Sequence, residues 1–207
     1  VTARMKNTKN IPIESSITLV VKISHKASGE IIEIDGVRYY YEKGVGVQKG
    51  LFKFEGDYYY AVYGGKLGAG KIIDVQYTSC DLPKGRYEFD ADGKMTQGIV
   101  EKDGVLYYYE NGRGVQKGLF KYNGDYYYAV YGGKLGVGKA IDVQYTSCDL
   151  PKGRYEFDAN GKMIQGIIER DGVLYYYENG RGVQKGLFKY NGDYYYAVYG
   201  GKLGVGK

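Results

Sequence analysis

The segment 104–171 reads GVLYYYENGRGVQKGLFKYNGDYYYAVYGGKLGVGKAIDVQYTSCDLPKGRYEFDANGKMIQGIIERD. The segment 36–103 before it differs at only 11 of 68 positions, and the segment 172–207 begins a third copy. A sequence that recurs at a fixed period of this length is built from one structural unit used several times. The fold is therefore decided by what one copy forms and by how it packs on the next.

Each copy divides again into three smaller units. In the second copy these begin at Gly104 (GVLYYYENG), Gly124 (GDYYYAVYGG) and Gly153 (GRYEFDANG), with spacings of 20, 29 and 19 residues. Each unit has an aromatic stretch, a Gly turn and a short second apolar stretch. Asn-Gly and Asp-Gly between apolar stretches are strong signals of a β-hairpin. Such dipeptides stand at 92–93, 111–112, 160–161 and 179–180.

Composition restricts the fold further. The 207 residues include 34 Gly and 27 Tyr, with no Trp and 3 Pro. Gly does not recur at every third position, as collagen requires, and the apolar content exceeds that of a disordered chain. No apolar stripe of 3.6-residue period indicates a helix. Because an isolated hairpin is marginal in water and stacking buries its apolar face, we predict an all-β fold, a β-solenoid of stacked β-hairpin repeats.

An insertion interrupts the longest of the three units. It covers Lys139–Lys152, where Ile141, Val143 and Tyr145 alternate with polar residues. Alternation of this kind is typical of a strand. We predict an extra strand or a longer loop there.

The first 35 residues do not belong to the repeat. Ser16–Ser24 (SITLVVKIS) is rich in β-branched residues, as strands are. This segment would be either a cap for the first repeat or the last strand of an immunoglobulin-like module. We divide the chain into an N-terminal β segment, 1–35, and a hairpin-repeat region, 36–207, with copies at 36–103, 104–171 and, in part, 172–207. The chain is expected to be a fragment of a longer protein.

The units GRYEFDANGKMIQGI (153–167) and GVLYYYENG (104–112) resemble the cell-wall-binding repeat superfamily of Gram-positive bacteria. This superfamily includes choline-binding repeats, glucan-binding repeats and the C-terminal repeats of large clostridial toxins. The resemblance covers 36–207, and the alternation of shorter and longer units is most similar to the toxin repeats. It implies a β-solenoid, a secreted or cell-surface location, and binding of carbohydrate or cell-wall polymer at seams between hairpins.

The sequence departs from the choline-binding pattern, which resembles Gly-Trp-Tyr-Tyr-Phe-Asp with a second Trp after the later Gly. Here the first Trp position holds Leu106, Asp125 or Arg154, and the second holds Leu119 or Ile167. A quaternary ammonium is recognised by a cage of aromatic faces. The missing walls argue against choline as the ligand.

The strand pattern predicts which tyrosines face outward. Side chains alternate between the two faces of a strand, and a carboxylate is seldom buried unpaired. Glu156 should therefore face solvent, while Tyr155 and Phe157 face the core. Alignment puts the middle Tyr of each YYY triplet in the Glu156 position, and its neighbours, such as Tyr107 and Tyr109, inside. The predicted outward, ligand-binding set is Tyr40, Tyr59, Tyr108, Tyr127, Tyr176 and Tyr195.

Outward tyrosines at a fixed spacing would suit a repeating polymer. A Tyr ring offers a flat apolar face and a hydroxyl for a sugar, and weak contacts add through avidity. Their alternative role is aromatic pairing across strands. A second candidate set lies in the AVYGG turns, with lysines that could reach an anionic group or simply be solvated. These residues are Tyr63, Tyr131 and Tyr199, and Lys66, Lys134 and Lys202.

The expected function is a non-catalytic module that binds glycan or cell-wall polymer in a secreted or surface bacterial protein. The alternative is a structural stalk or a protein-binding adhesin repeat, with a host surface protein as partner and no sugar affinity. The basic residues, for a net charge of +5, are spread along the chain, whereas a nucleic-acid face needs them clustered. No apolar run is long enough for a membrane span.

The sequence shows no motif of a catalytic or metal site. A carboxylate pair for glycoside hydrolysis stays open, although catalytic groups duplicated in each repeat would be unusual. His25 is the single histidine and has no visible partner, so we expect no enzyme activity, no cofactor and no metal. The segment 89–93 has too few oxygen ligands for a calcium loop. Cys80 and Cys148 lie one copy apart, beyond the reach of a disulfide if each copy makes about one turn of a superhelix. We predict two free, buried thiols, with intermolecular pairing as the alternative.

Overall fold

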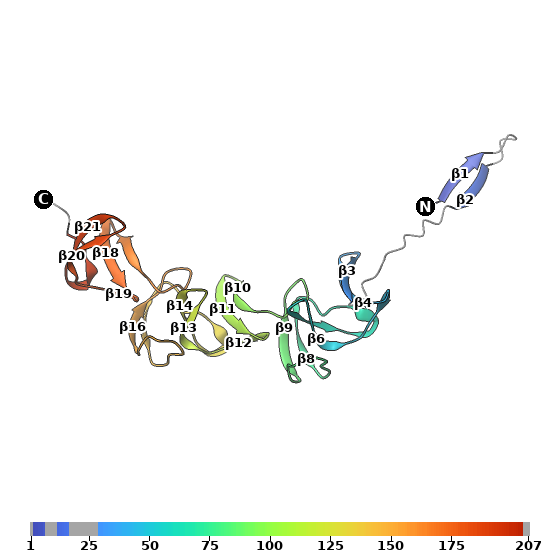
Figure 1. The fold of residues 1–207 in the computed structure, drawn as a ribbon, viewed down its shortest axis with the longest axis horizontal. Helices are drawn as coiled ribbons and strands as arrows, with labels where there is room; N and C mark the ends of the chain where they lie inside the picture. The colour runs from blue at the N-terminus through green and yellow to red at the C-terminus, as the bar shows by residue number, and fades with distance from the viewer. Residues whose placement is uncertain (1, 7–11, 17–28, 205–207) are drawn as a thin grey trace. The chain divides into compact units, whose positions relative to one another are not determined.

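The computed structural model describes residues 2–6, 12–16 and 29–204, and these residues form strands, turns and short 3₁₀ segments (Figure 1). The chain divides into two compact units, Val1–Gln48 with Ala61–Leu67 and Lys49–Tyr60 with Gly68–Lys207. The described sheets contain two or three strands, joined by antiparallel ladders such as 98–102 with 105–109 and 118–122 with 125–129. The predicted all-β fold of hairpin repeats is confirmed.

The first unit contains the non-repeat segment and the start of the first copy. Its elements are β1 (Thr2–Lys6), β2 (Pro12–Ser16), β3 (Glu30–Ile34), β4 (Val37–Glu42), β5 (Val45–Gly46) and η1 (Tyr63–Gly65). β1 pairs with β2, and β3, β4 and β5 form a three-stranded sheet. The predicted strand at Ser16–Ser24 lies outside the described residues apart from Ser16, as does His25. The boundary at residue 35 stays a prediction.

The second unit is a succession of three hairpin types. A hairpins are β10 (Gly98–Lys102) with β11 (Val105–Glu110) and β12 (Arg113–Gly114), and β17 (Gly166–Arg170) with β18 (Val173–Glu178) and β19 (Arg181–Gly182). B hairpins are β6 (Gly50–Phe54) with β7 (Asp57–Ala61), β13 (Gly118–Tyr122) with β14 (Asp125–Ala129), and β20 (Gly186–Tyr190) with β21 (Asp193–Ala197). C hairpins are β8 (Lys71–Val75) with β9 (Gly85–Phe89), and β15 (Ala140–Val143) with β16 (Gly153–Glu156). The 3₁₀ turns η2 (Tyr131–Gly133) and η3 (Tyr199–Gly201) follow the second and third B hairpins.

Two-residue turns connect the A and B strands. Asn123 and Gly124 have φ of 48° and 92°, and Asp103 and Gly104 have 49° and 72°. Positive φ at both central residues is the geometry of type I′ turns, which Asn-Gly and Asp-Gly favour. Each of these turns closes a five-residue ladder, such as Gly118↔Ala129 to Tyr122↔Asp125.

The hairpins are therefore shifted along the sequence from the predicted units. We expected each aromatic stretch to lead, through a Gly turn, into the next short apolar stretch. A turn does exist at Asn111–Gly112, but it joins β11 to β12 through only two residue pairs. The long ladders instead pair each short apolar stretch with the aromatic stretch that follows it, through five residue pairs.

The insertion supplies the extra strand that we predicted. β15 pairs with β16 from Ala140↔Glu156 to Val143↔Gly153, and Val143 is fully buried. Tyr145 follows in the connecting loop and is exposed. A C hairpin is thus a short strand, a long loop and the GRYEF strand.

The core consists of seams where one hairpin packs on the next. The A–B seam of the second copy buries Tyr108, Phe120, Tyr127, Ala129 and Leu135. The B–C seam buries Leu119, Val143, Tyr155, Phe157 and Met163. Each such ring or branched side chain contributes about 1.5–3 kcal/mol on burial. Within the second unit, hairpins stack in chain order, as the solenoid prediction requires.

Candidate functional site

The third seam, between a C hairpin and the A hairpin that follows it, is polar. Glu156 on β16 accepts a hydrogen bond from the Tyr177 hydroxyl (3.1 Å) and pairs with Arg170 (2.7 Å). Arg170 also donates to the Tyr177 hydroxyl at 2.9 Å. The preceding seam repeats this triad with Glu88, Tyr109 and Lys102: the Tyr109 hydroxyl donates to Glu88 at 2.9 Å, and Lys102 pairs with Glu88.

Partial burial gives these groups their electrostatic character. Burial is the main cause that raises the pKa of Tyr109, and the nearby Glu88 adds to it. Burial and the charge of Glu156 likewise raise the pKa of Tyr177. Both phenols therefore stay protonated at neutral pH and act as hydrogen-bond donors to the carboxylates.

An arginine closes each C–A seam. The Arg181 guanidinium carbon lies 4.5 Å from the centre of the Tyr155 ring, and its Nε donates to the Arg154 carbonyl at 3.0 Å. The Glu156 N–H donates to the Gly180 carbonyl at 2.8 Å. Together these bonds hold β19 against β16. In the earlier seam Arg113 has the same two contacts, with Tyr87 and Arg86.

A pocket opens at each of the two seams. The first, of about 350 Å³, is lined by Ile72, Arg86, Glu88, Tyr109 and the segment 112–114. The second, of about 610 Å³, is lined by the equivalents 68 positions later, namely Arg154, Glu156, Tyr177 and the segment 180–182, together with Tyr199 and Gly200. The two pockets offer the same charged and hydrogen-bonding groups in successive copies.

The 3₁₀ turns carry exposed tyrosines, and one of them, Tyr199, lines the second pocket. Tyr199 is 89% exposed and Tyr131 90% exposed. Gly182 allows this approach, since a Cβ there would lie 2.1 Å from the Gly200 carbonyl oxygen, and Gly114 stands in the same relation to Gly132. Side chains at the two positions would push η3 and η2 away from the seam.

Tyr63 is exposed in the same way but lacks the surrounding groups. It is 88% exposed on η1, and Gly46 lies against Gly64 as in the other copies. The position equivalent to Arg113 is Val45. Of the three predicted turn tyrosines, Tyr131 and Tyr199 are thus associated with a complete polar seam in the second unit.

The turn lysines do not line the seam pockets. Lys66, Lys134 and Lys202 are exposed, and each backbone bridges to the first Tyr of a YYY triplet. Lys134 instead borders a separate pocket of about 490 Å³ with Tyr128 and Ile141. Their predicted role toward an anionic group stays a prediction.

The predicted outward tyrosines are not outward. The structure buries Tyr40, Tyr59, Tyr108, Tyr127 and Tyr176 and half-buries Tyr195. The Tyr108 ring lies 4.4 Å from that of Phe120, and the Tyr176 ring lies 4.3 Å from that of Phe188. The reason is that a neighbouring hairpin covers each of the two faces of these strands. Alternation along the strand therefore separates residues of one seam from residues of the other, and it does not separate buried residues from exposed ones.

The predicted orientations of Glu156 and its neighbours are confirmed in part. Tyr155 and Phe157 are buried, as predicted, but Glu156 is only half-exposed because it faces the next A hairpin. Tyr109, placed in the interior, is buried in the polar C–A seam and contacts Glu88. The sequence signal that could have located this seam is the recurrence of Glu, Arg and Gly-Arg-Gly at a fixed distance from each other.

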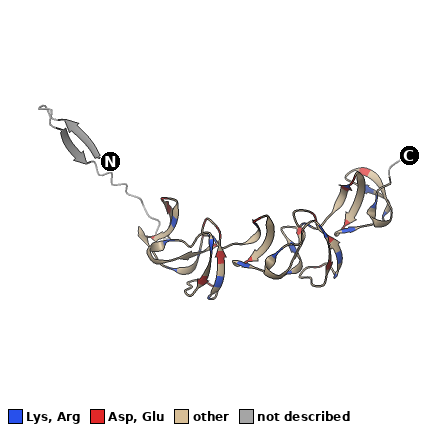
Figure 2. Cartoon of the chain, turned by 180° about the vertical axis from the view of Figure 1, so that it is seen from behind, with Lys and Arg blue, Asp and Glu red and all other residues tan. Residues whose placement is uncertain are grey.

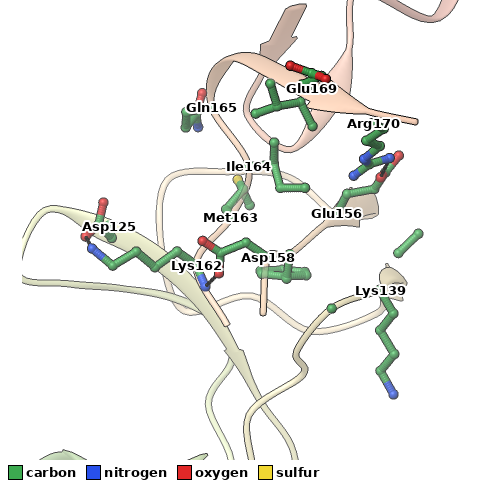
Figure 3. A pocket seen from close by; sticks show the side chains of 14 residues that line it. Asp125, Lys139, Glu156, Asp158, Lys162, Met163, Ile164, Gln165, Glu169 and Arg170 are labelled. Atoms are coloured by element: carbon green, nitrogen blue, oxygen red, sulfur yellow. Dashed lines mark hydrogen bonds and ion pairs between the residues drawn. The ribbon is translucent and has the colours of Figure 1, made fainter. Parts of the chain in front are cut away.

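A larger cleft lies on the other side of the Glu156–Arg170 pair (Figure 3). It has a volume of about 780 Å³, and Met163, Ile164 and Ile168 are among its apolar lining residues. Lys162 reaches to Asp125 across its rim at 2.6 Å. Phe157, the aromatic residue that lines it, is buried. The cleft offers charges but no exposed ring on which a sugar could stack.

Charges are mixed over the described repeats. Lys and Arg positions are interspersed with Asp and Glu positions along the described hairpins in Figure 2. None of the helical segments in the described part of the chain has the length and apolar character to cross a bilayer. Cys80 and Cys148 are free thiols, as predicted, but they are half-buried and not fully buried, because the loop of each C hairpin that carries them lies at the surface.

No protein-family model matches the chain, and no curated protein is similar to it in sequence. Solved structures with similar features include the choline-binding domain of CbpL from Streptococcus pneumoniae (20% identity, 84% of this chain and 85% of that chain, TM-score 0.40). Choline-binding protein F from the same organism matches at 18% identity over 87% of this chain and 94% of that chain, with a TM-score of 0.23. An alternansucrase in complex with isomaltononaose matches at 20% identity over 86% of this chain and 18% of that chain, with a TM-score of 0.27.

The first two are choline-binding proteins, one of the groups that the sequence resembles. At these identities and TM-scores, the likeness assigns no ligand and no binding residue to this chain.

Proposed function

We propose that the chain is a non-catalytic module of a secreted or surface bacterial protein, and that it binds a glycan or cell-wall polymer at its C–A seams. Tyr131 and Tyr199 are the stacking platforms, and the Glu, Arg and Tyr groups of the seams bind sugar hydroxyls. The observation that carries the proposal is the recurrence of one polar pocket, 68 positions apart. The exposed Tyr199 lines the second pocket, and in the first pocket Gly114 lies against Gly132, the residue after the exposed Tyr131.

The chemistry of the pocket suits a sugar. A pyranose presents an apolar C–H face to an aromatic ring and hydroxyls at its rim, and Tyr199 offers a ring that packing does not use. Glu156 accepts hydrogen bonds, while Arg154 and Arg181 donate them. Opposite charges in one pocket favour a neutral or mixed-charge polymer over a polyanion.

The repeat explains how weak sites could give useful affinity. Two similar sites on one chain convert the second contact into an intramolecular event, which raises avidity without new contacts. A polymer with repeating sugars can occupy both pockets, whereas a monosaccharide occupies one. We therefore expect affinity to rise with glycan length.

The competing function is a structural stalk or a protein-binding adhesin repeat. The specific observation in its favour is that Tyr108, Tyr127 and Tyr176 are buried in the core. Core packing therefore accounts for much of the high tyrosine content without a ligand. In this case Tyr131 and Tyr199 would be surface residues without sugar affinity.

A glycan array with this chain, covering bacterial cell-wall polymers and host mucin glycans, separates the two. We expect a selective hit that the double substitution Tyr131→Ala and Tyr199→Ala removes. Tyr63→Ala is the matched control, because it alters the same turn where Val45 replaces the arginine. A blank array with folded protein, or equal loss of binding with Tyr63→Ala alone, would contradict the seam-pocket proposal and favour the structural function.

A further inference from the structure

The large cleft beside the Glu156–Arg170 pair is a cavity separate from the two seam pockets. Its volume of about 780 Å³ exceeds that of either seam pocket. Glu156 lines both this cleft and the second seam pocket, so the two cavities share one wall. Ala140 lines the cleft on the side of the C hairpin, and we call this cavity the Ala140 cleft.

The first two copies differ in the lining of the Ala140 cleft. Four of the 11 differences between them fall on its lining residues, namely Ala140, Ile164, Ile168 and Arg170, where the first copy has Ile72, Thr96, Val100 and Lys102. One change removes a branched side chain, two enlarge the apolar lining, and the fourth keeps the positive charge. The second copy thus has a cleft of its own shape beside a conserved type of ion pair.

The residue at position 140 controls access to that ion pair. Ala140 stands opposite Glu156 in the β15–β16 ladder. In the β8–β9 ladder, Ile72 stands opposite Glu88. Side chains of directly opposite residues lie on the same face, with Cβ atoms about 4.5–5.5 Å apart. The carboxylate next to Ile72 is 20% exposed and its Lys partner 33%, whereas the carboxylate next to Ala140 is 29% exposed and its Arg partner 41%. The smaller side chain therefore leaves the second pair more open.

Contacts within the protein satisfy most charges of the cleft. Lys162 pairs with Asp125 at 2.6 Å, and Arg170 pairs with Glu156 at 2.7 Å. The Asp158 carboxylate accepts two backbone N–H groups of its own turn, at 2.9 and 2.8 Å. These contacts join the walls of the cleft and keep its polar groups in place.

One positive and one negative charge of the cleft are left for a ligand. Within the described part of the chain, Lys139 and Glu169 have neither an ion pair nor a side-chain hydrogen bond, and both side chains are exposed. Figure 3 shows them on opposite sides of the Glu156–Arg170 pair. A cleft with separated opposite charges and apolar lining suits a ligand that carries both charges at its ends.

We propose that the Ala140 cleft binds a short peptide with a free ammonium group, a free carboxylate and small apolar side chains. Glu169 accepts hydrogen bonds from the ammonium, and Lys139 donates to the carboxylate, which makes both contacts charge-assisted. Methyl side chains of the peptide fill the space beside Ala140 and contact Ile168. A sugar fits less well, because Phe157, the aromatic lining residue, is buried and offers no face for stacking.

The test titrates the full chain with trialanine, a peptide with free ends and methyl side chains. We expect saturable binding of one peptide per chain by calorimetry, with changes in the amide chemical shifts of residues 139–140 and 168–170 in the isotope-labelled chain. N-acetyl-trialanine amide should bind about tenfold more weakly, because it loses a charge-assisted hydrogen bond at each end. The result does not depend on glycan binding, since trialanine contains no sugar. Equal affinity for the two peptides would overturn the proposal.

Charge variants assign the two ends of the peptide. Lys139→Gln should weaken the binding of trialanine about fivefold and leave trialanine amide, which has no carboxylate, unaffected. Glu169→Gln should weaken trialanine by a similar factor and leave N-acetyl-trialanine, which has no ammonium, unaffected. Both residues are exposed, so the variants keep the fold. The opposite pattern would contradict the orientation and overturn the assignment of both charges.

Ala140→Ile tests the cleft itself. The variant should fold, because the first copy already has Ile72 opposite its carboxylate, and trialanine binding should fall about tenfold as the side chain fills the cavity. Val137→Ala is the matched control: it also restores a residue of the first copy, Ala69, at a position that does not line the cleft, and it should leave binding unchanged. Full binding by folded Ala140→Ile protein, or no saturable binding of trialanine by the folded parent chain, would overturn the proposal.

Discussion

The Arg181 guanidinium lies over the Tyr155 ring at 4.5 Å, and the side chain reaches from an A hairpin back to the C hairpin before it. Arg113 and Tyr87 repeat this relationship one copy earlier, again at 4.5 Å. The first copy has Val45 at this position. Arginine therefore stands at the two positions where a described C hairpin precedes the A hairpin, which assigns it a role in joining copies.

We expect Arg181→Val to destabilise the C–A seam. It removes a cation–π contact worth ~0.5–2 kcal/mol and a hydrogen bond to the Arg154 carbonyl worth about 1 kcal/mol. The free energy of unfolding from urea titration should fall by about 1–3 kcal/mol. Arg154→Val is the control, because its ion pair with Asp142 is exposed and worth about 0–1 kcal/mol. Equal losses for both would show that the Tyr155 contact is unimportant.

Substitution of Tyr108 tests the correction to the tyrosine assignment. The ring is buried between Phe120, at 4.4 Å, and Tyr122, at 5.4 Å, and its hydroxyl donates to Glu110 at 2.9 Å. Tyr108→Ala should cost about 3–5 kcal/mol of stability, as other buried aromatic truncations do. Tyr108→Phe, which keeps the ring, should cost about 0.5–1.5 kcal/mol.

The matched control is Tyr131→Ala, which truncates an exposed tyrosine of the same copy. Its thermal midpoint should stay within error of the parent chain, since exposed substitutions change stability by about 0.5 kcal/mol or less. If Tyr108→Ala and Tyr131→Ala were equally mild, the A–B seam would not be the aromatic core described above.

The fold could be predicted from the sequence more completely than the candidate site. Repetition, Asn-Gly and Asp-Gly turns and the alternation in Lys139–Lys152 were sufficient to predict a hairpin repeat with an extra strand. The register was missed because the dipeptides at 103–104 and 123–124 compete with those at 111–112 and 160–161, and local sequence does not decide which of them closes the longer ladder. That choice depends on which strands bury most surface in the seams.

The prediction of which tyrosines face outward was wrong for a different reason. Alternation identifies two faces of a strand, but it does not reveal that a second hairpin covers the face of Tyr108. Glu156 does not mark a solvent-facing position, because its partner Arg170 comes from the next hairpin and allows a half-buried carboxylate. Tyr131 and Tyr199 could be predicted as exposed because they stand in Gly-rich turns, where no strand pairing hides a ring.

Alkaline pH should weaken the repeat. Burial raises the pKa of Tyr108, Tyr109, Tyr127, Tyr176 and Tyr177 above the ordinary value of 10.0, with Glu110, Glu88, Glu178 and Glu156 as further causes for four of them. A raised pKa means that the folded chain holds these protons more tightly. Their stabilising effect is complete below the unfolded pKa and is lost as pH rises through the folded values.

The measurement is the urea midpoint between pH 8 and pH 12, with absorbance at 295 nm to follow tyrosine ionisation. We expect the midpoint to fall above about pH 10, and a group of tyrosines to ionise only as the chain unfolds. Tyr108→Phe removes one of these protons and should reduce the slope. A midpoint that does not change with pH up to 12 would contradict the burial of these phenols.

The last prediction concerns the contact between β19 and η3. Gly182 has no Cβ where one would lie 2.1 Å from the Gly200 carbonyl oxygen, and the obstacle is backbone, which cannot rotate away. Gly182→Ala should therefore separate η3 from the seam, lower stability by about 1–3 kcal/mol, and remove Tyr199 from its pocket. Gly204→Ala is a close control, because its nearest neighbour is the Tyr196 carbonyl oxygen at 3.7 Å, an ordinary contact. If the pocket binds glycan as proposed, Gly182→Ala weakens binding although it changes no side chain that would touch the sugar, and Gly204→Ala leaves binding intact. Full binding by a stable Gly182→Ala protein would mean that the position of Tyr199 beside the seam is not what the ligand requires.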